Sequence, residues 1–231
     1  MARRKSSITP QFEFDPRLGS TGRYTDKVTG RIVSQSTIDT ALESQINDAR
    51  IRGNKIATNL ANGKISLSEY QTAMMQEMKI INTQSAALAK GGWGQMTSSD
   101  WGAVGNLSRE QYSNLNKYAN DIASGKVKLR RLDGEINGQF LRTSDQFTQG
   151  GAQMYNEMKR REAGINGFTH EQRILDSGAK HCDCCIGEAG HWEALGTLTK
   201  IGNCTCSKNC RCHFEFGTLQ DDGSIVPAVG D

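Results

Sequence analysis

Residues 66 to 88, SLSEYQTAMMQEMKIINTQSAAL, decide the fold class of this chain. Ser66 is followed three residues later by Glu69, and such a pair can cap the first turn of a helix reciprocally. The apolar side chains that follow recur at steps of three, four or seven residues: Leu67, Tyr70, Met74, Met78, Ile81 and Leu88. This period gives a helix one apolar face, so the stretch predicts an amphipathic helix.

The segments on both sides carry the same helical period. We expect one helix from about Thr37 to a stop at Gly63. A second capping box, at residues 108–111, predicts the start of another helix that closes at Gly125. The chain around the opening stretch is therefore expected to be helical as well.

Two further helical segments are expected before the cysteines begin. One covers residues 127–148, and a shorter one follows Gly150. Short connections between amphipathic helices favour antiparallel neighbours. The sequence thus predicts a mainly α fold, with an elongated helical bundle over residues 34–177.

Both ends of the chain lack a sustained period. Residues 1–33 are expected to form an extended arm, in which residues 23–31 make a turn between two short extended pieces. Residues 217–231 are expected to be a loose tail or an arm that docks on a partner. No stretch approaches the roughly 18 apolar residues that span a bilayer, so no membrane contact is expected.

All seven cysteines lie between residues 182 and 212. Nothing in the sequence directs export, and cysteines clustered in a cytosolic chain favour metal binding over disulfides. The C-x2-C pair of Cys182 and Cys185 opens the run, and a tetrahedral zinc ion needs a second pair from a separate loop. The sequence therefore predicts a small Cys-rich module at residues 178–216 that binds Zn²⁺.

Four thiolates at about 2.3 Å fill the coordination sphere of zinc and leave no open position, which predicts a structural site. The preferred ligands are Cys182, Cys185, Cys206 and Cys210, with Cys212 as the main substitute. The residues expected outside the ligand set are His181, Cys184, Cys204 and His213.

Other interpretations of the cysteines stay open. They could be reduced structural thiols or disulfides. A catalytic zinc would need an open position and a nearby base, for which Glu188 and His191 lie close in sequence but outside any H-E-x-x-H motif. Between the two cysteine groups, residues 190–202 alternate bulky apolar residues with glycines, which predicts a β-hairpin with a miniature core.

The order of these residues resembles that of a known family. Cys182-x2-Cys185 is followed by Trp192, by Gly196-Thr197-Leu198, by Ile201-Gly202, and by Cys206-x3-Cys210-Arg211-Cys212 before Phe214-Glu215-Phe216. This pattern resembles the C-terminal module of Mu F-like minor head proteins of tailed phages, also called head morphogenesis proteins. Residues 23–34 and 88–96 look like the helical region before that module. Many members have a histidine where this chain has Ser207, so Cys206 is expected to replace it as ligand.

The resemblance implies a non-enzymatic virion component made in few copies in the host cytoplasm. Such a protein binds the portal or other head proteins, is oligomeric in the particle, can contact packaged DNA, and acts in head assembly, DNA packaging or delivery. A zinc-ribbon-like DNA-binding regulator is the alternative. Basic residues 126–131 and 159–161 could then contact phosphates.

Overall fold

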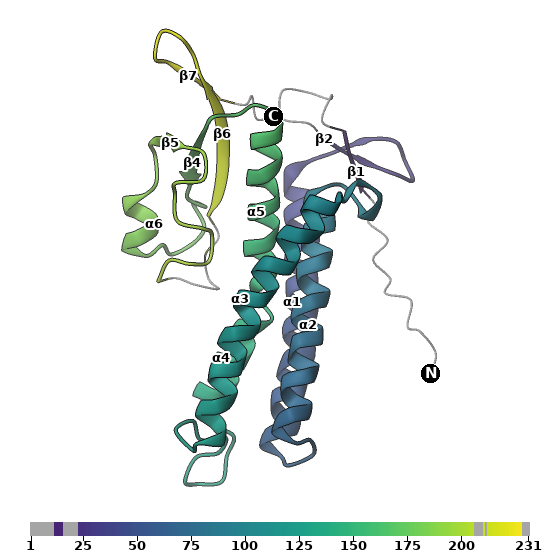
Figure 1. Cartoon of the computed structure of the whole chain (residues 1–231), viewed down its shortest axis with the longest axis vertical. Helices are drawn as coiled ribbons and strands as arrows, with labels where there is room; N and C mark the ends of the chain where they lie inside the picture. Colours follow the sequence, from purple (N-terminus) through teal and green to yellow (C-terminus); the bar gives the residue numbers. More distant parts are fainter. Residues whose placement is uncertain (1–11, 16–22, 206–209, 211, 228–231) are drawn as a thin grey trace. The chain divides into compact units, whose positions relative to one another are not determined.

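The computed structural model describes residues 12–15, 23–205, 210 and 212–227. The chain is mainly α, with small antiparallel sheets and a cysteine cluster near the C-terminus, which confirms the predicted fold class at this level (Figure 1). The described residues form two compact units: those within Met1–Thr40, Ala86–Thr97 and Tyr155–Asp231 belong to unit 1, and those within Ala41–Ser85 and Ser98–Met154 belong to unit 2.

The helices run in chain order through both units. They are α1 (Gln35–Ala61), α2 (Leu67–Ala89), the 3-10 helix η1 (Trp93–Gln95), α3 (Ser98–Ala123), α4 (Gly138–Phe147), α5 (Gly150–Ile165) and the short α6 (Asp183–Gly187). Among the described residues, none of these helices is both long and apolar enough to cross a membrane.

The helix predicted after Ser66 forms as α2. The capping box is made in both directions: the Ser66 backbone N–H donates to Glu69 Oε2 at 2.8 Å, and the Glu69 N–H donates to Ser66 Oγ at 3.2 Å. Tyr70, Met74 and Met78 on its apolar face are fully buried. Local capping and the apolar period are therefore sufficient to specify this helix.

The core of unit 2 forms around that face. Its buried residues are Ala57, Leu60, Ala61, Tyr70, Met74, Met78, Leu115, Tyr118 and Phe140. The two buried tyrosine hydroxyls are hydrogen-bonded: Tyr70 pairs with Ser144 Oγ at 2.9 Å, and Tyr118 donates to the Phe140 carbonyl at 3.2 Å. The aromatic side chains are thus buried without an unsatisfied hydroxyl.

The predicted start of the third helix was wrong. Because α3 already begins at Ser98, Ser108 lies inside the helix, where its Oγ accepts a hydrogen bond from Asn82 Nδ2 at 3.1 Å. A capping sequence is only a local signal, and here the helix continues through it.

The predicted helix over residues 127–148 is also shorter than expected. Its first part is a loop closed by a bridge between Arg130 and Ile136, with a left-handed Gly134 at its turn and Leu132 fully exposed. Asn137 then caps α4 by accepting from the Gln139 N–H at 2.9 Å. Turn and capping residues override the apolar spacing in this segment.

Close helix packing in unit 2 depends on Gly151 in α5. A Cβ at this position would lie 2.7 Å from Ser85 Oγ and 2.8 Å from Ile81 Cγ1. We expect G151A to lower the free energy of unfolding by about 1–3 kcal/mol, because the side chains of Ser85 and Ile81 must shift to accommodate the extra methyl group. Urea denaturation measures this change.

The matched control is G102A in α3, where a Cβ would meet nothing within 4 Å. This change should stabilise the protein by up to about 1 kcal/mol through helix propensity. Equal effects of the two substitutions would contradict the close contact at Gly151.

Unit 1 holds both sheets. The first has the order β1-β2-β3, from β1 (Phe12–Asp15), β2 (Arg23–Asp26) and β3 (Ile32–Val33). The predicted turn between two extended pieces is confirmed: Asp26 Oδ1 accepts from the N–H groups of Val28 and Thr29 at 2.8 and 3.0 Å. The Tyr24 hydroxyl donates to the Ala89 carbonyl at 2.7 Å and ties this sheet to the end of α2.

The second sheet has the antiparallel order β5-β4-β6-β7. Its strands are β4 (His170–Ile174), β5 (Trp192–Ala194), β6 (His213–Leu219) and β7 (Ile225–Pro227). The hairpin predicted within residues 190–202 was wrong, because β5 pairs with β4 and the chain turns at Gly196 to bury Leu198. Residues 217–227, expected to be a tail, form the end of β6 and its hairpin partner β7.

Candidate metal centre

The second sheet and α6 position the cysteines. Cys182 is the N-cap residue of α6 and Cys185 lies one turn later, so the C-x2-C spacing places both on one side of a short helix. Cys212 directly precedes β6, which pairs with β4 through Ile174 and His213. This pairing brings the end of β4 beside the second cysteine group.

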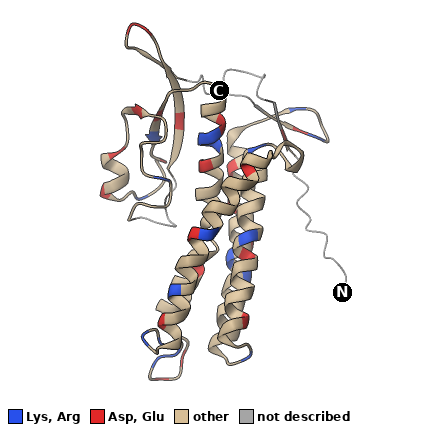
Figure 2. Ribbon diagram, in the orientation of Figure 1, with Lys and Arg blue, Asp and Glu red and all other residues tan. Residues whose placement is uncertain are grey.

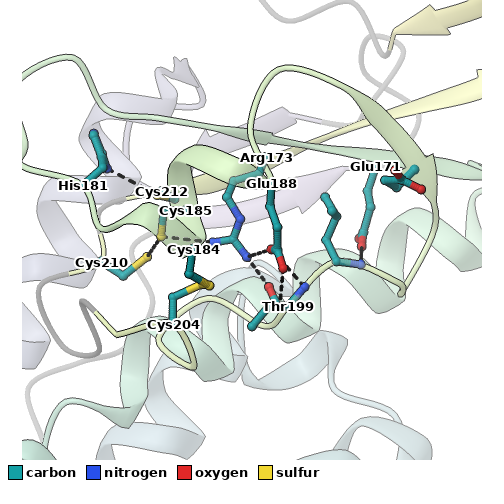
Figure 3. Close-up of polar contacts among 12 residues, drawn as sticks. Glu171, Arg173, His181, Cys184, Cys185, Glu188, Thr199, Cys204, Cys210 and Cys212 are labelled. Carbon is teal, nitrogen blue, oxygen red and sulfur yellow. Dashed lines mark hydrogen bonds and ion pairs between the residues drawn. A yellow bond between two sulfur atoms is a disulfide. The ribbon is translucent and has the colours of Figure 1, made fainter.

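Three sulfur atoms form a group that could hold a metal ion. The Sγ atoms of Cys185, Cys210 and Cys212 all lie within 4.8 Å of one another, and Cys185 and Cys212 are buried. The Sγ atoms of Cys185 and Cys210 are 3.7 Å apart, and Figure 3 shows them facing each other. Sulfurs bound at 2.3 Å to a tetrahedral zinc ion are about 3.8 Å apart, so this spacing fits a zinc–thiolate centre.

A second sulfur group shares Cys185 with the first. It contains Cys182, Cys185 and Cys204, again within 4.8 Å. Cys204, however, forms a disulfide with Cys184. While that bond is present, the Cys204 sulfur is no thiolate, so this group offers two thiols instead of three.

The structure describes four of the five predicted metal ligands. Cys182, Cys185, Cys210 and Cys212 are close to the centre and outside any disulfide, and Cys206 lies outside the described residues, as does Ser207. Cys212, predicted only as a substitute, belongs to the group of three sulfurs. The disulfide between Cys184 and Cys204 corresponds to the alternative left open by the sequence, and neither of these two cysteines was predicted as a ligand.

Arg173 of β4 supplies positive charge beside the sulfurs. Its side chain is fully buried, and Nη1 donates to Cys185 Sγ at 3.7 Å. Nη2 bonds Glu188 Oε2 at 2.9 Å and also donates to the Thr199 carbonyl. The guanidinium therefore partly offsets the negative charge of a thiolate at Cys185. Its bonds to Glu188 and Thr199 hold the guanidinium in this orientation.

The surroundings of Cys212 disfavour the thiolate form of its side chain while no metal ion is bound. Burial first, and the charge of Cys210 second, raise the pKa of the Cys212 thiol to about 11. A metal ion reverses this balance, because it binds thiolates and displaces their protons.

A buried ion pair lies next to these contacts in unit 1. Glu171 of β4 is fully buried and pairs with Arg160 Nε of α5 at 2.7 Å. Its Oε1 also accepts from the Leu198 N–H at 3.1 Å. Glu171 thus attaches the loop after β5 to the sheet.

The two residues considered for catalysis have other contacts. Both Glu188 oxygens are engaged, with Arg173 and with the backbone and hydroxyl of Thr199. His191 is half exposed and lies 3.8 Å from Glu193. These contacts disfavour Glu188 as a catalytic base.

Sequence reasoning did not identify Arg173, Glu171 or the environment of His181. His181 Nδ1 lies 3.6 Å from Cys212 Sγ, and its Nε2 lies 2.7 Å from the Asp176 carbonyl (Figure 3). The available signal was the position of His181 directly before the C-x2-C pair. The two buried charges of β4 gave no such signal.

Comparison with family models, with curated proteins and with solved structures finds no match to this chain.

Proposed function

We propose that this protein is a structural minor head protein of a tailed phage, whose C-terminal part is held together by one zinc ion. The observation that supports the metal best is the group formed by Cys185, Cys210 and Cys212. Their sulfurs come from two separate segments and meet within 4.8 Å. The motif resemblance described above supports the role in the phage head.

The buried position of the sulfurs favours a structural role for the metal. Cys185 is 0% exposed and Cys212 is 4% exposed, so an ion held by them is shielded from solvent. Bound zinc can contribute roughly 10–16 kcal/mol to the folding of a small module. That contribution matters here because β5 and β7 have only three residues each.

In this proposal the long helices form an elongated bundle that attaches the protein to the portal or to other head proteins. The metal-bound part is then a rigid docking element at the head–tail vertex, present in several copies and able to contact packaged DNA.

The contacts of the basic residues disfavour the alternative role as a DNA-binding regulator. Lys126 pairs with Asp121 at 3.1 Å, and Arg131 pairs with Asp133 at 3.1 Å. Arg130 donates to the Ala61 carbonyl at 3.0 Å. Figure 2 shows basic residues interspersed with acidic ones along the helices, which reduces the local positive potential.

Purified virions test both parts of the proposal at once. We expect the protein to copurify with assembled capsids, in lower abundance than the capsid protein, and to carry about one zinc ion per chain. Quantitative mass spectrometry and elemental analysis of the same particles measure both. A protein found only in the soluble extract of infected cells would contradict the virion role.

The regulator predicts a different result. Purified protein would shift duplex DNA at low salt, and the shift would weaken steeply as salt is added. We expect no such shift with the purified monomer, because in the proposed role the DNA contact is made inside the assembled particle.

A further inference from the structure

His181 lies between two polar partners that determine which nitrogen carries its proton. Nε2 is 2.7 Å from the Asp176 carbonyl oxygen, which can only accept a hydrogen bond. In the neutral imidazole Nε2 is therefore the donor, and Nδ1 keeps its lone pair. That nitrogen is the one that lies 3.6 Å from Cys212 Sγ.

This arrangement is typical of a metal-binding histidine. Such histidines usually donate the other ring N–H to a carboxylate or a backbone carbonyl, which fixes the tautomer and the ring orientation. The Asp176 carbonyl has this position, and Figure 3 shows His181 beside Cys212.

The distances agree with a shared tetrahedral centre. With Zn–S near 2.3 Å and Zn–N near 2.0 Å, a nitrogen and a sulfur on the same ion are about 3.5 Å apart. His181 Nδ1 and Cys212 Sγ are 3.6 Å apart, and Cys185 and Cys210 Sγ are 3.7 Å apart. Two edges of the coordination tetrahedron thus already have the expected length.

We infer that His181 completes the metal shell through Nδ1, giving a site of three thiolates and one imidazole with Cys185, Cys210 and Cys212. The inference rests on the proposed metal centre and replaces Cys182 and Cys206 in the predicted ligand set. The group of atoms within 4.8 Å of one another contains the three cysteines without His181, so this assignment requires Nδ1 to move closer to the other sulfurs when the metal binds. Cys182 stays in the neighbouring group, beside the disulfide-bonded Cys204.

Metal titrations of the full-length chain test this assignment. Zinc affinity is measured by competition with a chromophoric chelator for wild type, H181A, C182S and C206S. We expect H181A to bind at least roughly 100-fold more weakly, since loss of a mere outer-shell partner already costs 10–100-fold. C182S and C206S should bind like the wild type.

The variant H181C keeps the test valid if H181A fails to fold. Cysteine supplies a fourth soft ligand, so H181C should still bind one ion. With Co²⁺ in place of zinc, its sulfur-to-metal charge-transfer absorption should rise by about one third, because four thiolates replace three.

The other outcomes distinguish the two proposals. Wild-type affinity in H181A, or an unchanged charge-transfer band in H181C, would overturn the assignment of His181 and leave the metal centre intact. A large loss of zinc affinity in C182S or C206S would also overturn the assignment of His181, because it would make that cysteine a ligand. If the wild-type protein binds no zinc in the titration, the proposal of a metal centre is itself wrong.

Discussion

Replacing Cys185 by serine is expected to abolish zinc binding and to unfold the part of the chain that contains β4 to β7. Cys185 is fully buried and is the only residue shared by the two sulfur groups of the described chain. The change removes a metal ligand and with it much of the roughly 10–16 kcal/mol that bound zinc can supply to folding. It also removes the thiolate that faces Arg173. Zinc content and limited proteolysis of residues 170–227 measure the effect.

The matched control for C185S is C184S, a neighbour of the same residue type. Cys184 belongs to the disulfide with Cys204 and to neither sulfur group. C184S should therefore retain one zinc ion and lose only the stability that the disulfide provides, typically about 2–4 kcal/mol. Equal zinc loss in both variants, or full zinc binding by C185S, would contradict the central position of Cys185.

Helix α2 could be predicted from the sequence because its determinants are local. Ser66, Glu69 and the face with Tyr70 act within a few turns of one another, and the structure retains each of these contacts. At residues 108–111 the same capping signal was misleading, because α3 starts ten residues earlier and Ser108 bonds Asn82 of another helix. A local pattern cannot show which long-range partner competes for a side chain.

Strand β4 illustrates the opposite case. The residues on its inward face, Glu171 and Arg173, are fully buried charges, so the strand lacks the apolar alternation that predicts a strand. Their partners Arg160 and Glu188 lie 11 and 15 residues away in sequence. Only the fold reveals that these charges compensate one another.

The metal site was predictable from the sequence only where its geometry is local, as in helix α2. The C-x2-C spacing identifies Cys185 because its geometry is set by a single helical turn. The choice among the later cysteines depends on how β4 pairs with β6, which the spacing does not encode. The disulfide between Cys184 and Cys204 and the contact of His181 with Cys212 join residues that are 20 and 31 positions apart, so the local spacing does not reveal them either.

The buried pair of Arg160 and Glu171 leads to the second large expected effect. Both side chains are at most 7% exposed, and burial raises the pKa of Glu171, although Arg160 acts in the opposite direction. R160M leaves a buried carboxylate without its counter-charge, and we expect it to lower the free energy of unfolding by about 3–5 kcal/mol. E171Q should cost a similar amount, because the amide still accepts from Leu198 but the buried guanidinium keeps only the partly exposed Glu157, 3.9 Å away, as a counter-charge. Urea denaturation with saturating zinc measures both changes.

The double variant R160M/E171Q decides whether the pair acts as one unit. With both charges removed, no uncompensated ion remains buried, and the new thioether side chain can still pack on Phe214, whose ring centre lies 4.2 Å from the Arg160 guanidinium. The double variant should therefore be more stable than either single one. E157Q is the control, since Glu157 is partly exposed and its contact with Arg160 is long, at 3.9 Å. This change should lower the free energy of unfolding by less than about 1 kcal/mol. If the two single effects simply add in the double variant, the charges act independently and the loop after β5 is held by its other contacts.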